Sequence, residues 1–414
     1  MPNLKSICIP AAPLVDISAF LPLIDHPLFQ RLRGRKQLGI NDLVFPGAQH
    51  SRFEHALGVL GLTQQLCRLQ NFSPADSKHL QAFALLHDIG HGPFSHQIEP
   101  VLASDHHQVG QQRLLEIAPA LERCGLSLAE LQAMLAGTHP LSPWISDRNL
   151  GTDKLDYLHR DALHIGFQGT PDIEKIQRYT LMTDAGLAIQ EKYIEDAKQL
   201  QKFYSYLHQH GYLNKTALGV QRILQRAVQE ELLTRDSSGS ELWQMNDRQL
   251  LSWLENARSG LSRAFLRRLE SRAIHRTFLA LKPAGYGFVE RTTGKDLVVQ
   301  EWSRAALSKF SHCYQDINRL RDLEDELAAD CGMQAGDILF AAMPYFTKLI
   351  PKDLRVSTGT AERDYWLLEQ DKDHLRSLES DYLRTFAVRL LVIPEKRAAL
   401  AAQAEAVSAI LSAK

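Results

Sequence analysis

The sequence predicts an all-α protein that consists of a helical core and a C-terminal helical extension with a small β element. Three observations support this fold class. Apolar residues recur at helical spacing through most of the chain, loop signals separate the apolar segments, and strand-like patterns are confined to the C-terminal part. With 414 residues, the chain is long enough for one large domain or two of ordinary size.

The first 235 residues are expected to be helical throughout. Apolar residues lie at helical spacing from Leu57 to Leu66 and again from Leu80 to Leu86. Turn-forming residues at 45–48, 71–74 and 166–171 separate these helices, and Ser73 is the expected N-cap of a helix that starts near Pro74.

The polar stretch at residues 235–240, Arg-Asp-Ser-Ser-Gly-Ser, marks the expected boundary between a domain at 1–235 and a domain at 236–414. In the second domain, helices resume, and residues 285–290 and 296–300 are expected to pair as a hairpin around the turn at 291–295. A further strand is expected at 386–393, ended by Pro394. The Ala-rich stretch at 395–414 predicts a terminal helix.

Composition excludes several classes of protein. The 47 Lys and Arg residues balance 48 Asp and Glu residues, so there is no overall field to attract nucleic acid or anionic lipid. The five scattered cysteines indicate reduced thiols. No signal peptide or long apolar run is present, and we expect a cytoplasmic protein without membrane contact.

Histidine is concentrated in one part of the chain. Eleven of the 17 histidines lie between His50 and His164, where an even spread would place about five. Imidazole is a metal ligand, an acid and a base near neutral pH, so this concentration indicates metal binding or phosphate chemistry.

The dipeptide His87-Asp88 is the first candidate for metal binding. It ends an apolar helical run and precedes Gly90, Gly92 and Pro93, which favour a helix end where adjacent side chains can reach one cation. A second imidazole is available from His55, and a second carboxylate from residues 152–157, Thr-Asp-Lys-Leu-Asp-Tyr. Two His and two Asp would suit one divalent ion of Mn, Fe, Mg, Ni or Zn.

These segments resemble the HD-domain phosphohydrolases, most closely the deoxynucleoside triphosphate triphosphohydrolase branch that includes SAM- and HD-domain enzymes and dGTPases. The resemblance covers roughly residues 20–180 and fades beyond about residue 235, and it makes the domain at 1–235 an HD-domain catalytic core. It is carried, in order along the chain, by HPLFQRLR at 26–33, KQLG at 36–39, VFPGA at 44–48, RFEH at 52–55, LHDIGHGPFSH at 86–96, DKLDY at 153–157 and RD at 160–161.

The resemblance implies a role for each of twelve residues. One divalent metal ion per site would be held by His55, His87, Asp88 and Asp153. Catalytic residues would be His96, which acts on the scissile phosphate, its acidic partner Glu99, and His91, which contacts phosphate. Contacts to phosphate and sugar would come from Gln37, Arg52, His106 (with His107 as the alternative), Lys154 and Tyr157.

Elementary chemistry agrees with these roles. His96 and Glu99 are three residues apart, so on a helix the carboxylate can orient an imidazole that donates a proton to a leaving oxygen. Arg52 and Lys154 would supply positive charge where phosphate charge develops. Asp156 and Asp161 are expected to support the ligands or to pair with Arg160.

The chain departs from the triphosphohydrolase pattern in residues 206–219. His210 stands where those enzymes have a phosphate-binding Arg, and Leu218 and Gly219 stand where they have a Tyr-Gln pair. Glu99 also replaces an Asp. These departures put the triphosphate leaving group and the base preference in question.

The expected function is hydrolysis of a dNTP to deoxynucleoside and triphosphate. The alternatives are an HD-domain phosphatase or phosphodiesterase that acts on another nucleotide, and a regulator that binds nucleotide or nucleic acid without turnover. Family members assemble, so a homo-oligomer is expected, and a nucleotide effector remains open. The basic residues 31–36 would line a polyphosphate or nucleic-acid path, although an exposed helix face explains them equally well. For the arginines between Arg258 and Arg272, a solvated face paired with nearby acids is the preferred interpretation, and RNA, DNA or a nucleotide effector is the alternative.

Overall fold

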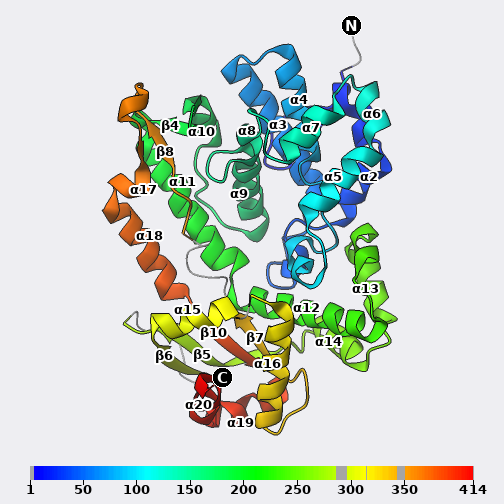
Figure 1. The fold of residues 1–414 in the computed structure, drawn as a ribbon, viewed down its shortest axis with the longest axis vertical. Coiled ribbons are helices and arrows are strands. Elements are labelled where there is room, and N and C mark those ends of the chain that lie inside the picture. The colour runs from blue at the N-terminus through cyan, green and yellow to red at the C-terminus, as the bar shows by residue number, and fades with distance from the viewer. Residues whose placement is uncertain (1–3, 286–295, 314, 343–349, 414) are drawn as a thin grey trace.

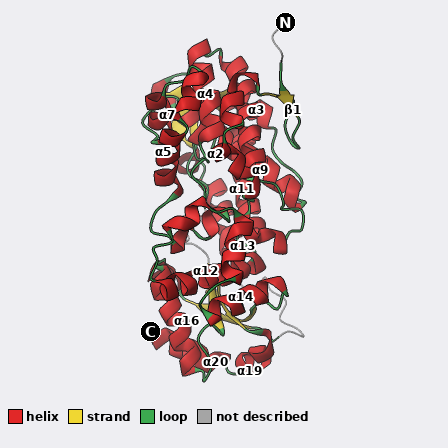
Figure 2. Ribbon diagram, turned by 90° about the vertical axis from the view of Figure 1, so that its right-hand side faces the viewer, coloured by secondary structure: helices red, strands yellow, loops and turns green. Residues whose placement is uncertain are grey.

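The computed structural model describes residues 4–285, 296–313, 315–342 and 350–413, and shows a mostly helical protein with two lobes stacked along its long axis (Figures 1 and 2). The N-terminus lies near one end of the long axis and the C-terminus lies toward the other. Each lobe has its own cluster of buried apolar side chains. No described helix is long and apolar enough to cross a membrane.

Helices dominate the first lobe, in which α3, α4 and α9 are the central elements. Ser73 caps α4 by accepting a hydrogen bond from Asp76 N, as predicted. The helices are α1 (Leu21–Ile24), α2 (Pro27–Gln30), α3 (Arg52–Gln70), α4 (Pro74–Leu86), α5 (His106–Glu116), α6 (Ala118–Arg123), α7 (Leu128–Leu135), α8 (Pro143–Ser146), α9 (Thr152–Ile165), α10 (Ile173–Tyr179) and α11 (Ile194–Leu207). Short 3₁₀ turns include η2 (Arg31–Gly34), η3 (Gly39–Leu43), η4 (Ser95–Gln97) and η5 (Glu99–Val101).

The prediction that the first 235 residues are all-helical is wrong. Strands β1 (Ser6–Ile7) and β2 (Val15–Asp16) pair with each other. Strands β3 (Thr180–Thr183) and β4 (Gly186–Gln190) form a hairpin that continues through β8 (Arg355–Ser357) to β9 (Tyr365–Trp366). The β3–β4 pairing is local, but β4 also pairs with β8, far along the chain, so no local pattern indicates how the whole sheet is assembled.

The second lobe is built around a four-stranded sheet with the order β6-β5-β10-β7. Its strands are β5 (Arg276–Pro283), β6 (Val298–Trp302), β7 (Ile338–Ala342) and β10 (Val388–Val392). Its helices are α12 (Lys215–Arg235), α13 (Asp247–Glu255), α14 (Gly260–Glu270), α15 (Arg304–Cys313), α16 (Ile317–Asp330), α19 (Arg397–Ala402) and α20 (Ala404–Ala413). Helices α17 (Leu367–Gln370) and α18 (Lys372–Thr385) return along α11 to the sheet (Figure 1).

The predicted β element is larger than a hairpin. The strand expected at 386–393 is confirmed as β10, which lies between β5 and β7 with every residue buried. The first strand of the expected hairpin and its turn lie, beyond residue 285, outside the described residues. The second expected strand corresponds to β6, which pairs in parallel with β5. The expected terminal helix is present as two helices, α19 and α20, separated at Gln403.

Helix α12 packs in the second apolar cluster although it precedes the predicted boundary at residue 235. Its buried residues, including Ile223, Leu224 and Val228, lie with the sheet of the second lobe. The division at 235 therefore stays a prediction. The four cysteines that the structure describes, Cys8, Cys67, Cys124 and Cys331, are unpaired.

The buried side chain of His275 makes the stability of the second lobe sensitive to pH. Its Nε2 donates to Gly336 O at 2.9 Å, and burial lowers the pKa of His275 to about 4. The unfolded chain, with an ordinary histidine pKa of about 6.5, binds the proton first, so stability is full above that pH and falls below it. We expect the free energy of unfolding to drop by about 2 kcal/mol between pH 7.5 and 5 from this group.

The variant His275→Gln tests this, because a glutamine amide can keep the bond to Gly336 and does not titrate. Urea unfolding of both proteins at several pH values should show a shallower pH dependence for the variant. Parallel curves for the two proteins would contradict the assignment.

Candidate functional site

Four predicted ligands come together where three helices meet. His55 lies in the first turn of α3, His87 and Asp88 directly follow α4, and Asp153 lies in the first turn of α9. Asp153 Oδ1 lies 3.1 Å from His55 Nε2 and 3.5 Å from His87 Nε2. Asp88 lies 3.8 Å from His55 Nε2 through Oδ2 and 3.6 Å from His87 Nε2 through Oδ1.

The imidazoles of His55 and His87 are oriented so that their Nε2 atoms face the carboxylates of Asp88 and Asp153. His55 Nδ1 hydrogen-bonds Asp156 Oδ2 at 2.8 Å, and His87 Nδ1 donates to the carbonyl of Ala84 at 2.8 Å. Such partners fix the tautomer of a ligand histidine and hold its ring. His87 Nε2 is buried and makes no hydrogen bond to any described residue.

These donors fit a divalent cation. One ligand atom each from His55, His87 and Asp153 lies within 4.8 Å of the others, and Asp88 closes the group. Although burial opposes it, hydrogen bonds to Asp153 and Asp156 raise the pKa of His55 to about 10, so the carboxylates draw positive charge to this point. Two imidazoles and two carboxylates form the mixed N/O set that transition metals bind.

Asp156 is itself held by Arg160, one turn further along α9. Arg160 Nε donates to Asp156 Oδ2 and Nη2 donates to Oδ1, both at 2.9 Å, within a fully buried pair. The pair lies against Gly58 of α3, where a Cβ would come within 2.0 Å of Arg160 Nη2. The absence of a side chain at Gly58 therefore lets α9 approach α3 closely enough for Asp156 to reach His55.

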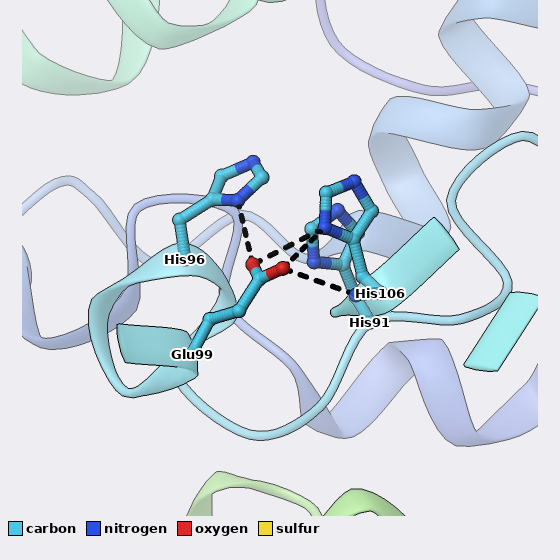
Figure 3. Close-up of side chains that lie close together, drawn as sticks. All are labelled: His91, His96, Glu99 and His106. Carbon is cyan, nitrogen blue, oxygen red and sulfur yellow. Dashed lines mark hydrogen bonds and ion pairs between the residues drawn. The ribbon is translucent and has the colours of Figure 1, made fainter. Parts of the chain in front are cut away.

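A second cluster contains the histidines predicted to act on phosphate (Figure 3). Glu99 lies between His96, whose Nδ1 is 3.1 Å from Oε2, and His106, whose Nδ1 is 2.9 Å from Oε1. The ring of His91 stacks on His106 with centroids 4.1 Å apart. His107, the alternative to His106, is exposed and packs beside His106 outside this cluster.

Glu99 is ionised in this setting. Burial opposes ionisation, but hydrogen bonds from His106 and His96 hold the pKa of Glu99 below its usual range. His96 is 64% exposed through its side chain, so its imidazole remains accessible from solvent. The two clusters are connected because His91 Nε2 lies 3.3 Å from Asp88 Oδ1.

Arg52 bridges the metal-binding group and the loop after it. Its Nη1 donates to Asp88 Oδ2 and its Nε donates to Ser95 Oγ at 2.6 Å. Arg52 and Gln37 both line a central cleft of about 400 Å³, together with Asp88, His96 and Asp153. The Gln37 Oε1 atom is buried and has no partner among the described residues.

Lys154 and Tyr157 lie on the other side of Asp153. Lys154 Nζ donates to Arg148 O at 2.5 Å and lies 3.6 Å from the centroid of the Tyr204 ring. Burial lowers the pKa of this lysine to about 7. Tyr157 lines the central cleft and a neighbouring cavity, and burial raises the pKa of its hydroxyl.

The three residues that depart from the triphosphohydrolase pattern at 206–219 lie away from the central cleft. His210 is exposed, Leu218 belongs to the second apolar cluster, and Gly219 lies near Leu391, so none of the three lines the central cleft. The residues of this region that line the cleft include Tyr204, His208 and Tyr212.

The sequence analysis missed these three residues, although their spacing of four and four, one face of a helix, was a usable signal. They lie on α11 and on the π-helical turn η7 (His208–Tyr212). Tyr212 donates through its hydroxyl to Asp161 at 2.5 Å, and His50 Nε2 is 2.7 Å from the other oxygen of Asp161. Asp161 thus supports the cleft and makes no pair with Arg160 among the described contacts.

Residues of the second lobe hold the loop that carries His91 and His96. Arg31 donates to the carbonyls of Ile89 at 2.5 Å and Trp243 at 3.0 Å. Gly92 lies against Trp243, which belongs to the 3₁₀ turn η8 (Ser240–Gln244); a Cβ at Gly92 would be 3.0 Å from the Trp243 ring.

The same segment is fixed at a second point. Asp247 accepts from Phe94 N at 2.7 Å and from Lys36 N at 2.9 Å. Arg35 is buried and, like the half-buried Arg31, donates to backbone carbonyls, including Met245 O. Arg31 and Arg35 of the basic run 31–36 therefore bind this chain itself, whereas Arg33 is exposed.

Comparison with known proteins agrees with this arrangement. The HD domain family model matches residues 52–161. An uncharacterized protein of Methanocaldococcus jannaschii is 30% identical over 264 residues, which cover 63% of this chain and 56% of that one. The deoxynucleoside triphosphate triphosphohydrolase SAMHD1 of Homo sapiens is 30% identical over 244 residues, which cover 47% of this chain and 38% of that one. The chain spans about half the length of the curated relatives that it matches first.

Solved structures extend the likeness to both lobes. A phosphohydrolase from Bacteroides thetaiotaomicron superimposes with a TM-score of 0.70 at 20% identity, over 94% of this chain and 100% of that one. A hypothetical protein from Aquifex aeolicus gives a TM-score of 0.68 at 22% identity, over 96% and 99%. The fold is therefore shared along nearly the whole chain. The predicted resemblance to HD-domain proteins is confirmed by the family match over residues 52–161 and by the curated relatives.

Removing the support of His55 should weaken metal binding. In Asp156→Asn, the Nδ1 atom of His55 loses its carboxylate partner, and such losses cost about 10- to 100-fold in metal affinity. Titration of the variant with Mn²⁺, followed by calorimetry, measures this change. The matched control is Asp184→Asn, which removes an exposed carboxylate from the β3–β4 turn.

Circular dichroism of both variants establishes that they are folded. Equal Mn²⁺ affinity in Asp156→Asn and Asp184→Asn would contradict the supporting role of Asp156.

Proposed function

Because this chain contains an HD domain, we propose that it is a metal-dependent phosphohydrolase that cuts a dNTP into deoxynucleoside and triphosphate. The observation that carries the proposal is the convergence of His55, His87, Asp88 and Asp153, with a buried His87 Nε2 that lacks a hydrogen-bond partner among the described residues. The relatives named deoxynucleoside triphosphate triphosphohydrolase support the choice of substrate.

The four ligands would hold one divalent ion, which is Mn, Fe, Mg, Ni or Zn on the basis of the donor set. When bound, such an ion polarises a phosphoryl oxygen and makes water more acidic. The roles of the surrounding side chains follow from their positions.

His96 would donate a proton to the leaving oxygen. The ionised Glu99 binds its Nδ1, which leaves Nε2 as the atom that carries the proton toward the cleft. Arg52 would place fixed positive charge beside the reacting phosphate, where negative charge develops. His91 and His106 would contact phosphate from the other side of Glu99.

The other end of the cleft suits a nucleoside. Gln37, Asn41 and Tyr212 offer neutral hydrogen-bonding groups there, and Asp161 repels phosphate. Tyr204 and His208, with ring centroids 4.0 Å apart, add aromatic surface. We propose that this end accepts the sugar and the base.

The product of hydrolysis tests the function directly. Protein with Mn²⁺ is incubated with each dNTP, NTP, NMP and cyclic nucleotide, and the released phosphate species is identified by chromatography. We expect triphosphate from dNTPs and none from Asp153→Ala, which lacks one ligand. Orthophosphate would instead identify a phosphatase, and a nucleoside monophosphate, formed from a cyclic nucleotide or together with pyrophosphate from a triphosphate, would identify a phosphodiesterase. Binding of polynucleotide without any product would identify a regulator.

The sequence argument for a different nucleotide rests on His210, Leu218 and Gly219, which stand where the triphosphohydrolases have an Arg and a Tyr-Gln pair. None of the three lines the cleft, so another nucleotide stays the alternative that the product assay distinguishes.

The variant His96→Gln tests the proton donor separately from the metal. Loss of a general acid typically lowers kcat by about 10² to 10⁴. Because His96 is not among the four ligands, the Mn²⁺ content of the variant should equal that of the parent. The control His312→Gln changes an exposed histidine of α15 and should retain full activity. Full activity of His96→Gln would refute the role of His96.

A further inference from the structure

We propose that the cavity beside Lys154 binds the distal phosphates of the substrate, with Arg148 and Lys352 as its binding cations. This proposal rests on the proposed function and names the site that recognises a triphosphate. The cavity has a volume of about 470 Å³ and is adjacent to the central cleft.

The position of the cavity follows from the residues that it shares with the cleft. Asp153, Tyr157 and Tyr204 line both spaces. The side chain of Asp153 is 35% exposed, whereas those of the other three metal-binding residues are 11% exposed or less. A phosphate held at the ligand cluster can therefore continue past Asp153 into this cavity.

The central cleft lacks free positive charge for a polyphosphate. Arg52 is the cation that lines it within the described part of the chain, and its guanidinium is bonded to Asp88. Asp161 adds negative charge at the far end. A triphosphate carries several negative charges, so its distal phosphates need cations that the cleft does not supply.

The cavity supplies those cations. Arg148, Lys154 and Lys352 line it, and the side chains of Arg148 and Lys352 form no ion pair with the described residues. Two acidic residues face the same space. Asp147 already accepts from the backbone N–H groups of Asn149 and Leu150, both at 2.8 Å, and Asp153 faces the metal ligands.

Lys154 is the fixed member of this group. Its ammonium is held by Arg148 O and the Tyr204 ring, and the residue is 5% exposed. Arg148 and Lys352 are exposed and free to close on an anion, with the Arg148 guanidinium able to bind two phosphate oxygens at once. A triphosphate bound at the metal ligands is long enough to reach these cations, whereas a monophosphate is not.

The test measures binding of inorganic triphosphate and of orthophosphate to the Mn²⁺-loaded full chain by calorimetry. In Arg148→Gln/Lys352→Gln, the Kd for triphosphate should rise at least tenfold, and the Kd for orthophosphate should change less than twofold. Arg148→Lys, with Lys352 intact, should bind triphosphate more tightly than Arg148→Gln. The control Arg363→Gln/Lys396→Gln removes the same two charges from exposed positions elsewhere.

Unchanged triphosphate binding in Arg148→Gln/Lys352→Gln, or equal weakening in the control, would overturn the proposal. The measurement requires no turnover, so it is separate from the function. A protein that hydrolyses no nucleotide but shows the tenfold effect retains this site and refutes the proposed activity. A protein that releases triphosphate from dNTPs without the effect refutes the site alone.

Discussion

The close approach of α3 and α9 is the constraint on which the rest of the site depends. Gly58 leaves room for the buried ion pair of Asp156 and Arg160. In this position Asp156 hydrogen-bonds the Nδ1 atom of His55. Asp153, one turn earlier on α9, lies close to the Nε2 atom of His55. Helix α9 thus supplies both Asp156, which orients the His55 imidazole, and Asp153, which would bind the same metal ion as His55.

Glu99 has a comparable position in the neighbouring cluster. Its carboxylate accepts hydrogen bonds from the imidazoles of His96 and His106 and from the backbone N–H of His106. A carboxylate with so many donors remains ionised, and it orients His96 while it holds His106 against His91. The predicted pairing of Glu99 with His96 is present, at 3.1 Å.

Much of the site could be predicted from the sequence because its residues follow local signals. His87 and Asp88 precede a glycine-rich helix end, and His96 and Glu99 are three residues apart, so short-range geometry indicates their relation. The spacing of residues could not show that Asp153 lies beside the histidine ligands. This prediction depended on the resemblance to the HD-domain phosphohydrolases. The exposure of His210 could not be predicted either, because it lies in the π-helical turn at 208–212, where the α-helical spacing of side chains is interrupted.

The fold was predictable only in part, for a related reason. Helices α3 and α4 show their periodicity within a few turns, and β10 is a short apolar run that ends before a proline. In two of the strand pairings, β5–β10 and β4–β8, the paired strands lie more than a hundred residues apart in sequence. Sheets assembled from such distant segments are decided by tertiary packing, which a local pattern does not record.

Trp243 and Asp247 give the histidine loop a foundation outside the segment that matches the HD domain family. A protein fragment cut at residue 161, or at 235, would keep every proposed ligand and lose the indole beneath Gly92 and the carboxylate that anchors Phe94 N. A fragment that keeps the histidine loop in place consequently has to extend beyond residue 247, and any displacement of η8 would be transmitted to the imidazoles.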